Sequence, residues 1–239
     1  MTPPIFRVPP QAVGASTVTL DGPEGHHAAD VRRLRVGEAI WLTDGTGARG
    51  IAAVVAVRRG ALDAHVTEWS TDHGPAPRLV VAQALAKGGR DEAAVETMTE
   101  VGVDEVVGWQ AARSVAKWTD RTAAKWTSVA EAAARQSRRT WWPTVTGPAS
   151  TADVVTRIRA ADVCVVLHES ASEPIAMLDW TGAGEVLVIV GPEGGISDDE
   201  LAFFVAAGAR PTRLGETVLR SSTAGVAALA VIASRTRWT

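Results

Sequence analysis

The chain has 239 residues, of which 46% are apolar, enough for one large domain or two small ones around a buried core, and its net charge of −3 does not by itself indicate a nucleic-acid partner. No apolar run approaches the roughly 20 residues that cross a bilayer, and the first residues lack a charged segment followed by an apolar stretch, so we expect a cytoplasmic protein without membrane association. The single cysteine, Cys164, lies in an apolar run where an inert buried thiol is expected, which leaves neither a disulfide framework nor a thiolate metal site.

Up to about residue 72, short alternating or apolar runs are separated by turns rich in Gly, Asp and Pro, which predicts a small β domain. The expected strands cover 17–20, 39–43, 50–57 and 62–69. A helix or turn from Gly25 to Leu34 interrupts them and carries His26 and His27, which do not predict a metal pair because adjacent side chains diverge from any regular element. Residues 73–77 form a linker by composition.

From residue 78 onward, apolar strands alternate with helical patterns, which predicts an α/β domain with a mostly parallel sheet covered by helices over 78–239. Gly102 and Gly208 each follow a helical run and are expected to close it in the left-handed conformation. The expected strands are 78–85, 104–109, 162–167, 185–190 and 211–214, and the expected helices are 91–101, 120–139, 150–159, 198–207 and 221–235.

One segment of the chain is strongly basic. Residues 110–145 hold seven basic and two acidic side chains, together with four of the nine tryptophans. Arginine and aromatic side chains bind phosphates and unstacked bases, so the segment is a candidate RNA-binding surface. An equally good interpretation is a solvated helix whose tryptophans pack in the core.

The strongest local signal is the strand 185–190 followed by a glycine-rich turn over Gly191 to Ile196 and a capped helix start. Ser197 and Glu200 fit a capping box. Three glycines in five residues allow a backbone to approach a ligand closely, whereas a simple tight turn needs only one. The spacing fits neither the dinucleotide nor the triphosphate fingerprint.

Two further strand ends carry polar residues. The stretch from Leu214 to Gly225 leads into the last helix, which Ser221, Ser222 or Thr223 can cap. Arg220 there opposes the helix dipole, so another reason for its presence is expected. His168 and Glu169 follow the third strand, either as acid–base groups or as ordinary hydrogen-bonded loop residues. Loops after neighbouring parallel strands predict a site at the carboxyl edge of the sheet.

Taken in order, these loops and several other stretches resemble the RsmE family of 16S rRNA uridine N3-methyltransferases, which belong to the SPOUT class. The matching stretches are Phe6 to Pro9, His26 to Leu34, Gly37, Lys87 to Arg90, Thr99 to Val103, Arg113 to Val115, Glu131 to Arg138, Leu167 to Glu169, Gly191 to Ile196 and Leu214 to Arg220. One departure lies in the last motif, where the family usually has Arg-Thr-Glu-Thr and this chain has Ser222 in place of the acid.

The resemblance implies a PUA-like β-barrel for RNA over 1–72 and a SPOUT α/β domain with a deep trefoil knot over 78–239, a topology that pattern reasoning would not find because threaded chains are rare. It also implies a homodimer that uses S-adenosyl-L-methionine, without metal, to methylate N3 of a uridine in the decoding region of 16S rRNA, conventional position 1498, in the small ribosomal subunit.

The resemblance further implies which residues act. Arg113 and Arg220 would stabilise the deprotonated base electrostatically, and no single general base is expected. The expected cofactor residues are Leu167, His168, Glu169, Gly191, Pro192, Glu193, Gly194, Gly195, Ile196, Leu214, Gly215, Val218, Leu219 and Ser222. The expected RNA-binding residues are Arg7, Arg32, Arg33, Arg35 and Arg138.

Two rival functions are consistent with parts of the pattern. A non-catalytic RNA-binding or ribosome-assembly factor on the same fold is favoured by the missing acid at Ser222 and disfavoured by the glycine-rich loops; cofactor binding distinguishes the two. A nucleotide-dependent oxidoreductase is disfavoured because the turn from Leu85 to Gly89 lacks the dinucleotide fingerprint.

Overall fold

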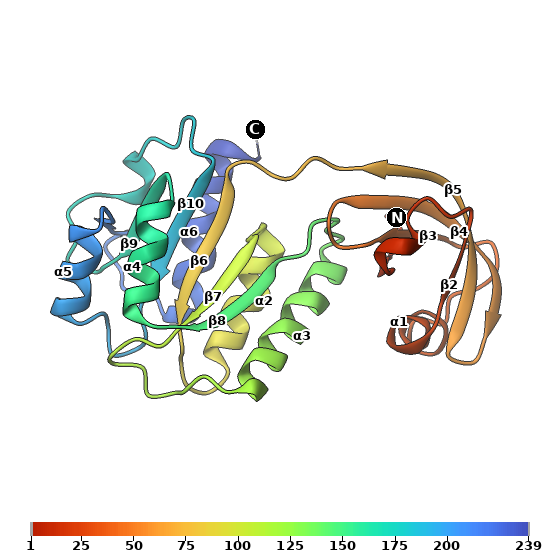
Figure 1. The fold of residues 1–239 in the computed structure, drawn as a ribbon, viewed down its shortest axis with the longest axis horizontal. Coiled ribbons are helices and arrows are strands. Elements are labelled where there is room, and N and C mark those ends of the chain that lie inside the picture. The colour runs from red at the N-terminus through yellow and green to blue at the C-terminus, as the bar shows by residue number, and fades with distance from the viewer. Residues whose placement is uncertain (1, 239) are drawn as a thin grey trace. The chain divides into compact units, whose positions relative to one another are not determined.

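The computed structural model describes residues 2–238. By its internal contacts the chain forms two compact units (Figure 1). The first unit contains residues 1–74 and 134–142, and the second contains 75–133 and 143–239. The segment 134–142, which lies inside the range expected for the α/β domain, therefore packs with the β domain. No helix within residues 2–238 is long and apolar enough to span a bilayer.

The first unit is built on a five-stranded sheet with the order β1-β3-β4-β5-β2. Its strands are β1 (Ile5–Arg7), β2 (Thr17–Leu20), β3 (Ala39–Thr43), β4 (Ala48–Arg58) and β5 (Ala61–Thr71), joined by η1 (Pro10–Ala12), α1 (Gly22–His26) and the π-helical turn η2 (His27–Val31). One face packs a core that includes Phe6, Ile40, Leu42 and Leu62. The predicted small β domain is confirmed, although β1 was not predicted because its three residues lie between proline pairs and show no alternation.

The segment 134–142 is held in the first unit by stacking and hydrogen bonds. Two guanidinium groups contact the Trp142 ring, with the Cζ of Arg7 at 5.0 Å and that of Arg135 at 5.3 Å from the ring centroid. Arg135 also forms an ion pair with Glu24 at 2.5 Å. The Trp141 indole donates to the carbonyl of Asp72 at 3.0 Å. These contacts complete the β unit with a piece of chain from far along the sequence.

The second unit contains a six-stranded sheet with the order β11-β9-β10-β6-β7-β8. All of its strand pairs are parallel, which confirms the predicted parallel sheet. The strands are β6 (Arg78–Ala84), β7 (Glu105–Trp109), β8 (Thr144–Ala149), β9 (Val163–Leu167), β10 (Glu185–Val190) and β11 (Arg210–Thr212). The helices are α2 (Arg90–Val101), α3 (Asp120–Gln136), α4 (Thr151–Ala160), η3 (Ile175–Met177), α5 (Asp198–Ala206) and α6 (Ser221–Thr236).

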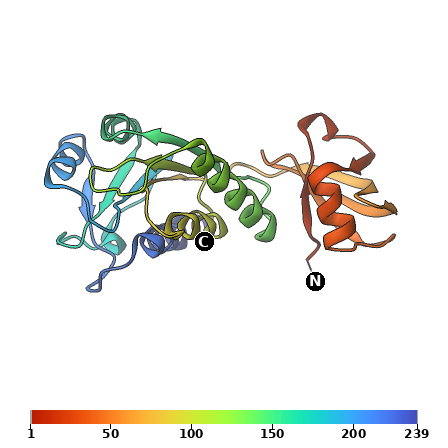
Figure 2. The same ribbon diagram turned by 90° about the horizontal axis from the view of Figure 1, so that it is seen from below.

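Helices cover both faces of this sheet because alternate residues of each buried strand face opposite sides. On β6, Leu79 and Val81 join the core formed with α2, α3 and α6, whereas Val80 and Ala82 join the core formed with α4 and α5. Figures 1 and 2 show these two helical layers on either side of the strands. The layers leave the carboxyl ends of the central strands to be covered by loops.

Helix ends follow the predicted chemistry in two places and not in a third. Gly102 and Gly208 are left-handed, with φ of 106° and 110°, and close α2 and α5 as predicted. The helix predicted to run to residue 139 ends at Gln136, because Arg138 takes φ of 59° and Arg139 donates back to Ala134 at 2.9 Å, the pattern of a Schellman motif with arginine in the usual glycine position.

Strand β8 was not predicted, because the Gly147 and Pro148 within it are typical of loops. It lies at the sheet edge and its register shifts opposite β7, which are the places where a strand tolerates proline. The predicted strand 211–214 lies instead at Arg210–Thr212, which leaves Arg213 and Leu214 in the loop that follows.

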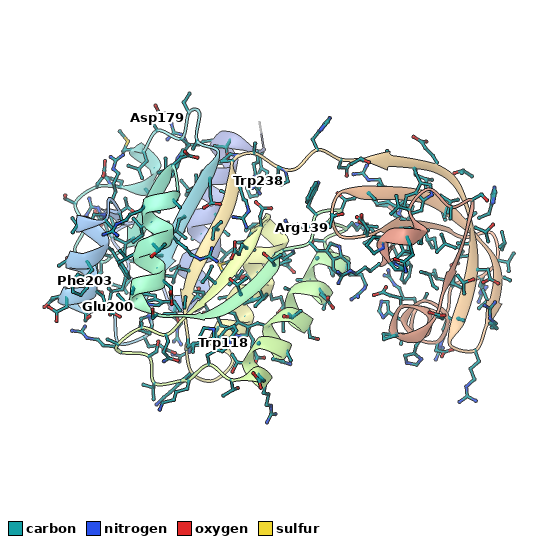
Figure 3. All side chains as sticks on the ribbon, viewed as in Figure 1. Trp118, Arg139, Asp179, Glu200, Phe203 and Trp238 are labelled. Atoms are coloured by element: carbon teal, nitrogen blue, oxygen red, sulfur yellow. The ribbon has the colours of Figure 1, made fainter. Side chains whose placement is uncertain are left out.

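The four tryptophans of the basic segment are packing residues. Trp126 is fully buried in the core of the second unit and contacts Trp118 edge-on with the ring centroids 5.2 Å apart (Figure 3). Trp141 and Trp142 pack in the first unit as described above. Trp126 therefore confirms the alternative of a core tryptophan, while the other three rings are only partly buried and RNA binding by the segment stays a prediction. Cys164 is buried, and this burial raises the pKa of its thiol to about 12, as expected for an inert thiol.

Candidate functional site

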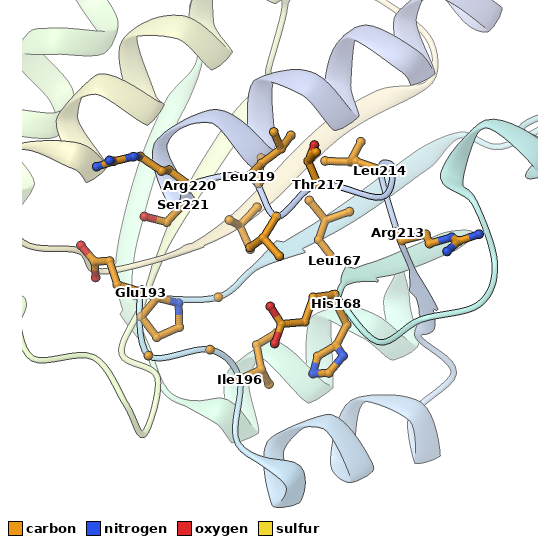
Figure 4. Close-up of a pocket in the computed structure, with 18 of the residues that line it drawn as sticks. Leu167, His168, Glu193, Ile196, Arg213, Leu214, Thr217, Leu219, Arg220 and Ser221 are labelled. Atoms are coloured by element: carbon orange, nitrogen blue, oxygen red, sulfur yellow. The ribbon is translucent and has the colours of Figure 1, made fainter.

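A cavity of about 620 Å³ opens where β9, β10 and β11 end and α6 begins (Figure 4). This is the carboxyl edge of the parallel sheet, where open α/β folds bind ligands. The cavity is lined by Arg90, Arg113, Leu167, His168, Glu169, Val190, Gly191, Pro192, Glu193, Gly194, Gly195, Ile196, Asp198, Thr212, Arg213, Leu214, Gly215, Glu216, Thr217, Val218, Leu219, Arg220, Ser221 and Ala224.

The lining brings together nearly all the residues that the sequence placed at the site. Both expected catalytic arginines, Arg113 and Arg220, line the cavity, as do all the expected cofactor residues except Ser222. Ser222 lies in the first turn of α6 and is absent from the lining. Thr212 and Arg213 also line the cavity and were not singled out from the sequence, while Arg90 and Ser221 were named there but not as site residues. Thr212 and Arg213 were hidden because they fell inside an expected strand.

The glycine-rich loop after β10 has little room for side chains. A Cβ on Gly191 would lie 2.7 Å from the Cγ1 of Ile196, closer than real Cβ contacts. Gly195 has φ of 74°, a conformation that residues with a Cβ rarely adopt. Glycine at these positions allows the loop to fold tightly so that its backbone borders the cavity.

Arg113 is bonded to this loop. Its guanidinium Nη1 donates to the carbonyl of Gly194 at 3.1 Å and to that of Ile196 at 3.4 Å. Arg113 lies on the chain that leaves β7, so these hydrogen bonds tie one strand-end loop to another. The arginine therefore fixes the backbone of the loop in addition to placing a positive charge at the cavity.

Glu193 ties a third loop to the same place. Its Oε1 accepts from the backbone nitrogen of Lys87 at 3.1 Å and from Nη1 of Arg90 at 3.2 Å. Partial burial would raise the pKa of the Glu193 carboxyl, but the hydrogen bonds from its own backbone, Lys87 and Arg90 lower that pKa below its ordinary value. Glu193 is therefore an ionised clamp between the loops that follow β6 and β10.

Glu200 combines two structural functions. With Ser197 it forms the predicted capping box of α5, in which the Ser197 hydroxyl accepts from the Glu200 nitrogen and Glu200 Oε2 accepts from the Ser197 nitrogen at 3.1 Å. Its Oε1 also accepts from the nitrogen of Ala112 at 2.8 Å and from the hydroxyl of Thr151 at 3.1 Å. Through Ala112, Glu200, which is labelled in Figure 3, fixes the backbone next to Arg113, a function that the capping motif alone did not reveal.

These hydrogen bonds make the stability of the protein depend on pH through Glu200. Burial would raise the pKa of this carboxyl, but the hydrogen bonds from Ala112, Ser197 and Thr151 outweigh burial and hold the pKa below its ordinary value. A lowered folded-state pKa stabilises the fold above the unfolded-state pKa and loses that contribution as the pH falls.

We expect Glu200→Gln to lower the free energy of unfolding at pH 7 by about 1–3 kcal/mol, because the amide leaves buried N–H donors without acceptors. We also expect the difference from wild type to start shrinking as the pH falls below about 4.3, the ordinary pKa of a glutamate, and to vanish only below the lower folded-state pKa. Urea unfolding across this pH range measures both. A difference that stayed constant with pH would show that the charge of Glu200 is not the stabilising feature.

The start of α6 differs from the predicted cap. Arg220 is the N-cap residue and its side chain makes no capping hydrogen bond, while the first turn contains no acidic residue. The prediction that Ser221, Ser222 or Thr223 caps α6 is therefore wrong, since all three lie inside the helix. Arg220 is exposed at the cavity and makes no ion pair with any residue in 2–238.

His168 and Glu169 do not bond to each other in the structure. The His168 ring nitrogen Nδ1 lies 2.8 Å from the Ser170 hydroxyl, and its backbone nitrogen donates to Thr212 at 3.0 Å. The first residue of the pair is thus a hydrogen-bonded loop residue at the cavity wall, as the simpler interpretation of the sequence held.

The five arginines expected to bind RNA all lie in the first unit and all are exposed. Arg7 stacks on Trp142, and Arg138 belongs to the same segment of chain. For Arg32, Arg33 and Arg35, no ion pair is formed with the described part of the chain. Burial and then the positive charges of Arg135 and Arg32 lower the pKa of His27 in the same unit.

No group of three or more His, Cys, Asp and Glu side chains among the described residues is arranged to hold a metal ion.

Comparisons with known proteins agree with this two-part architecture. A family model for an RNA methyltransferase domain matches residues 74–233, and a model for an RNA methyltransferase PUA domain matches residues 20–67. The ribosomal RNA small subunit methyltransferase E of Mycobacterium tuberculosis is 45% identical over 233 residues, covering 93% of this chain and 88% of the relative. The Bacillus subtilis protein of the same name is 30% identical, covering 93% of this chain and 91% of its own length.

The chain belongs to the ribosomal RNA small subunit methyltransferase E family. Solved structures share its fold. One, described as a hypothetical protein, is 29% identical with a TM-score of 0.82, covering 98% of this chain and 99% of its own. The methyltransferase E of Neisseria gonorrhoeae, bound to S-adenosyl methionine, has a TM-score of 0.89 at 22% identity, covering 98% of each chain, and at this identity it supports the fold alone.

Membership in the methyltransferase E family confirms the predicted fold class, with a PUA-like β domain followed by an α/β methyltransferase domain. The trefoil knot stays a prediction.

Proposed function

We propose that this protein uses S-adenosyl-L-methionine to methylate N3 of a uridine in the decoding region of 16S rRNA, conventional position 1498, within the small ribosomal subunit. We propose further that it acts in the cytoplasm as a homodimer. The observation that carries the proposal is the cavity at the sheet edge, which gathers the glycine-rich loop, the loop from Leu214 to Leu219 and two arginines in one place.

The lining of the cavity fits this cofactor. Leu167, Ile196 and Leu214 offer apolar surface for an adenine ring, and Arg90 and Glu193 offer charges for the amino-acid end. A Cβ on Gly215 would meet nothing within 4 Å, so the backbone there borders open space that a ligand can fill. The hydroxyl of Thr212 is buried at the cavity wall without a hydrogen-bond partner among the described residues, a polar atom available to a ligand. The cavity is also in the size range of small-molecule sites.

Methyl transfer requires the protein mainly to position the uracil and to stabilise charge. When bound, the cofactor supplies a methyl group already activated by its sulfonium, and the N3–carbon bond forms as the sulfur–carbon bond breaks with its electron pair left on sulfur. The residues of this chain must align the uracil with that methyl group and favour loss of the N3 proton. Arg220 would stabilise the negative charge that deprotonation spreads over the uracil oxygens. Arg113 would act beside it by holding the glycine-rich loop.

The RNA would be bound through the arginines of the first unit. Guanidinium groups on Arg7, Arg32, Arg33, Arg35 and Arg138 are exposed, and contacts of this kind with phosphate release counterions from the RNA. The net charge of the whole chain therefore does not oppose RNA binding, because the first unit carries 10 basic and 8 acidic side chains and the excess of acidic residues lies in the second unit.

We expect Arg138→Ala to weaken RNA binding and to reduce the slope of log affinity against log salt by about 1, the change for one lost phosphate contact. Titrations of a 16S rRNA fragment at several salt concentrations measure the slope. Arg159→Ala is a matched control, because Arg159 is an exposed arginine on α4 in the other unit. An unchanged slope for the Arg138 variant would remove this residue from phosphate contact.

The proposed function is tested by methylation of small ribosomal subunits that lack the modification, followed by mapping of the methylated base. Methyl transfer to N3 of the expected uridine supports the proposal. Tight binding of subunits without cofactor binding or methyl transfer would support the ribosome-assembly alternative instead.

A further inference from the structure

The amino end of α6 presents unused hydrogen-bond donors to the cavity. Thr223 and Ala224 donate their backbone N–H groups to the carbonyl of Arg220, at 2.8 and 2.9 Å, but the N–H groups of Ser221 and Ser222 donate to no described residue. The N-cap side chain does not accept from them, and the first turn lacks acidic residues. α6 has 16 residues, so its dipole adds positive potential at this end.

A second observation at the same place indicates a ligand. The side-chain oxygen of Ser221 is buried and has no hydrogen-bond partner within residues 2–238, although Ser221 is only 8% exposed. Buried hydroxyls are normally paired, so an unpaired one at a cavity wall indicates a partner that arrives with a ligand. Figure 4 shows the Ser221 hydroxyl pointing from the start of α6 toward the loop that carries Glu193.

We propose that Ser221 is a further catalytic residue, whose hydroxyl, together with the free N–H groups at the start of α6, donates to a carbonyl oxygen of the target uracil as N3 loses its proton. The inference rests on the proposed function and deepens it. Because Ser221 is the first residue of its helix, no preceding turn restricts rotation of its side chain, and the hydroxyl can turn to meet a group that enters the cavity.

The positions of the charged residues around the cavity indicate that the group bound beside Ser221 is a deprotonated uracil. Ser221 and Arg220 lie with Glu193 on one side of the cavity, whereas Leu214, Thr217 and Arg213 lie on the other (Figure 4). The Glu193 carboxylate is paired with Arg90 at 3.2 Å, so among the described residues the unpaired charge on this side is the positive one of Arg220. Loss of the N3 proton to water leaves a negative charge shared by N3 and its two flanking oxygens. Donors fixed beside one of these oxygens stabilise that charge without reorganisation.

The same arrangement gives a reason for the absence of an acidic residue at position 222. A carboxylate at position 222 would lie in the first turn of α6 and would neutralise its positive end. With Ser222 there, the helix end and Arg220 keep their full positive potential for the substrate. This chain would then favour the deprotonated base by stabilising it, without a carboxylate to take the proton.

The test compares Ser221→Ala, Ser221→Thr and Thr223→Ala in single-turnover methylation of small ribosomal subunits at saturating cofactor. We expect Ser221→Ala to slow methyl transfer roughly 10²-fold, the effect of losing one oxyanion donor, and to shift the rise of the rate to higher pH. Ser221→Thr keeps a hydroxyl and should restore most of the rate. Thr223→Ala, which removes an exposed hydroxyl of the same helical turn outside the cavity, should stay within about twofold of wild type.

Cofactor affinity and thermal stability separate a catalytic role from a structural one. Because the hydroxyl has no partner in the described part of the chain, Ser221→Ala should melt at the wild-type temperature or above, and it should bind cofactor within a few-fold of wild type. A normal rate for Ser221→Ala in an assay where the wild type is active would overturn the role of Ser221 alone. A large loss of cofactor affinity or a lower melting temperature would do the same. A wild-type protein that transferred no methyl group would overturn the proposed function and this role together.

Discussion

Arg220→Ala is expected to slow methyl transfer by about 10²-fold or more while leaving cofactor affinity within a few-fold of wild type. Arg220 is exposed at the cavity as the N-cap of α6, where a cation is unfavourable to the helix by roughly 0.3–1 kcal/mol. A positive charge kept at this position despite its cost to the helix is best explained by an anion that forms during the reaction. Loss of one preorganised charge stabiliser typically slows a reaction by about 10²-fold or more.

Single-turnover kinetics on small ribosomal subunits and calorimetry of cofactor binding measure the two effects separately. Arg213→Ala is the matched control, because Arg213 lines the same cavity on the opposite side. The wild-type rate should also rise with pH, since the reactive form of the base is deprotonated. An Arg220 variant with a normal rate, or one whose whole defect lies in cofactor binding, would remove this residue from catalysis.

Gly195→Val is expected to reduce cofactor affinity at least tenfold. At φ of 74° a residue with a branched Cβ is strained by about 1–3 kcal/mol, and the loop would leave its observed conformation to relieve the strain. The new side chain would also crowd Arg113, whose Nη1 lies 3.7 Å from the position of a Cβ. A free-energy loss of about 1.4 kcal/mol corresponds to a tenfold change in affinity.

Gly182→Val provides the control for backbone strain. Gly182 has φ of 76°, nearly the same as Gly195, but it lies outside the cavity and a Cβ there would meet nothing within 4 Å. Calorimetry should therefore show normal cofactor binding for this variant, with some loss of stability. If Gly195→Val also bound cofactor normally, in the presence or absence of a chelator, the cofactor site would lie elsewhere.

The sequence predicted the fold and the site best where a single local rule determines both the conformation of a residue and its place in the domain. Parallel strands end at one edge of a sheet, so the pattern of strands and helices is enough to predict that the residues following β9 and β10 meet. Gly102 and Gly208 could be predicted as helix ends for a similar reason, because the left-handed conformation is nearly specific to glycine. The helix that Arg138 ends was predicted too long, since arginine in that conformation has no sequence signal.

Features that depend on what a side chain meets in space could not be predicted. The capping motif identified Glu200, but its hydrogen bond to Ala112 joins residues 88 positions apart. Ser221 carried a signal only as a possible cap, and its importance comes from the absence of a partner for its hydroxyl among residues 2–238. The tryptophans of 110–145 looked suited to RNA by composition, whereas the structure uses Trp126 in the core.

The segment 134–142 affects how this architecture can be inherited. Since the β unit is completed by Trp141 and Trp142, a gene fragment that ended at the linker would encode a β domain without the residues that pack on Gly47 and Arg7. A single recombination event at that boundary could therefore not transfer the β unit intact to another protein. Changes in the β unit and changes at the end of α3 are instead expected to be selected together, as parts of one inherited unit.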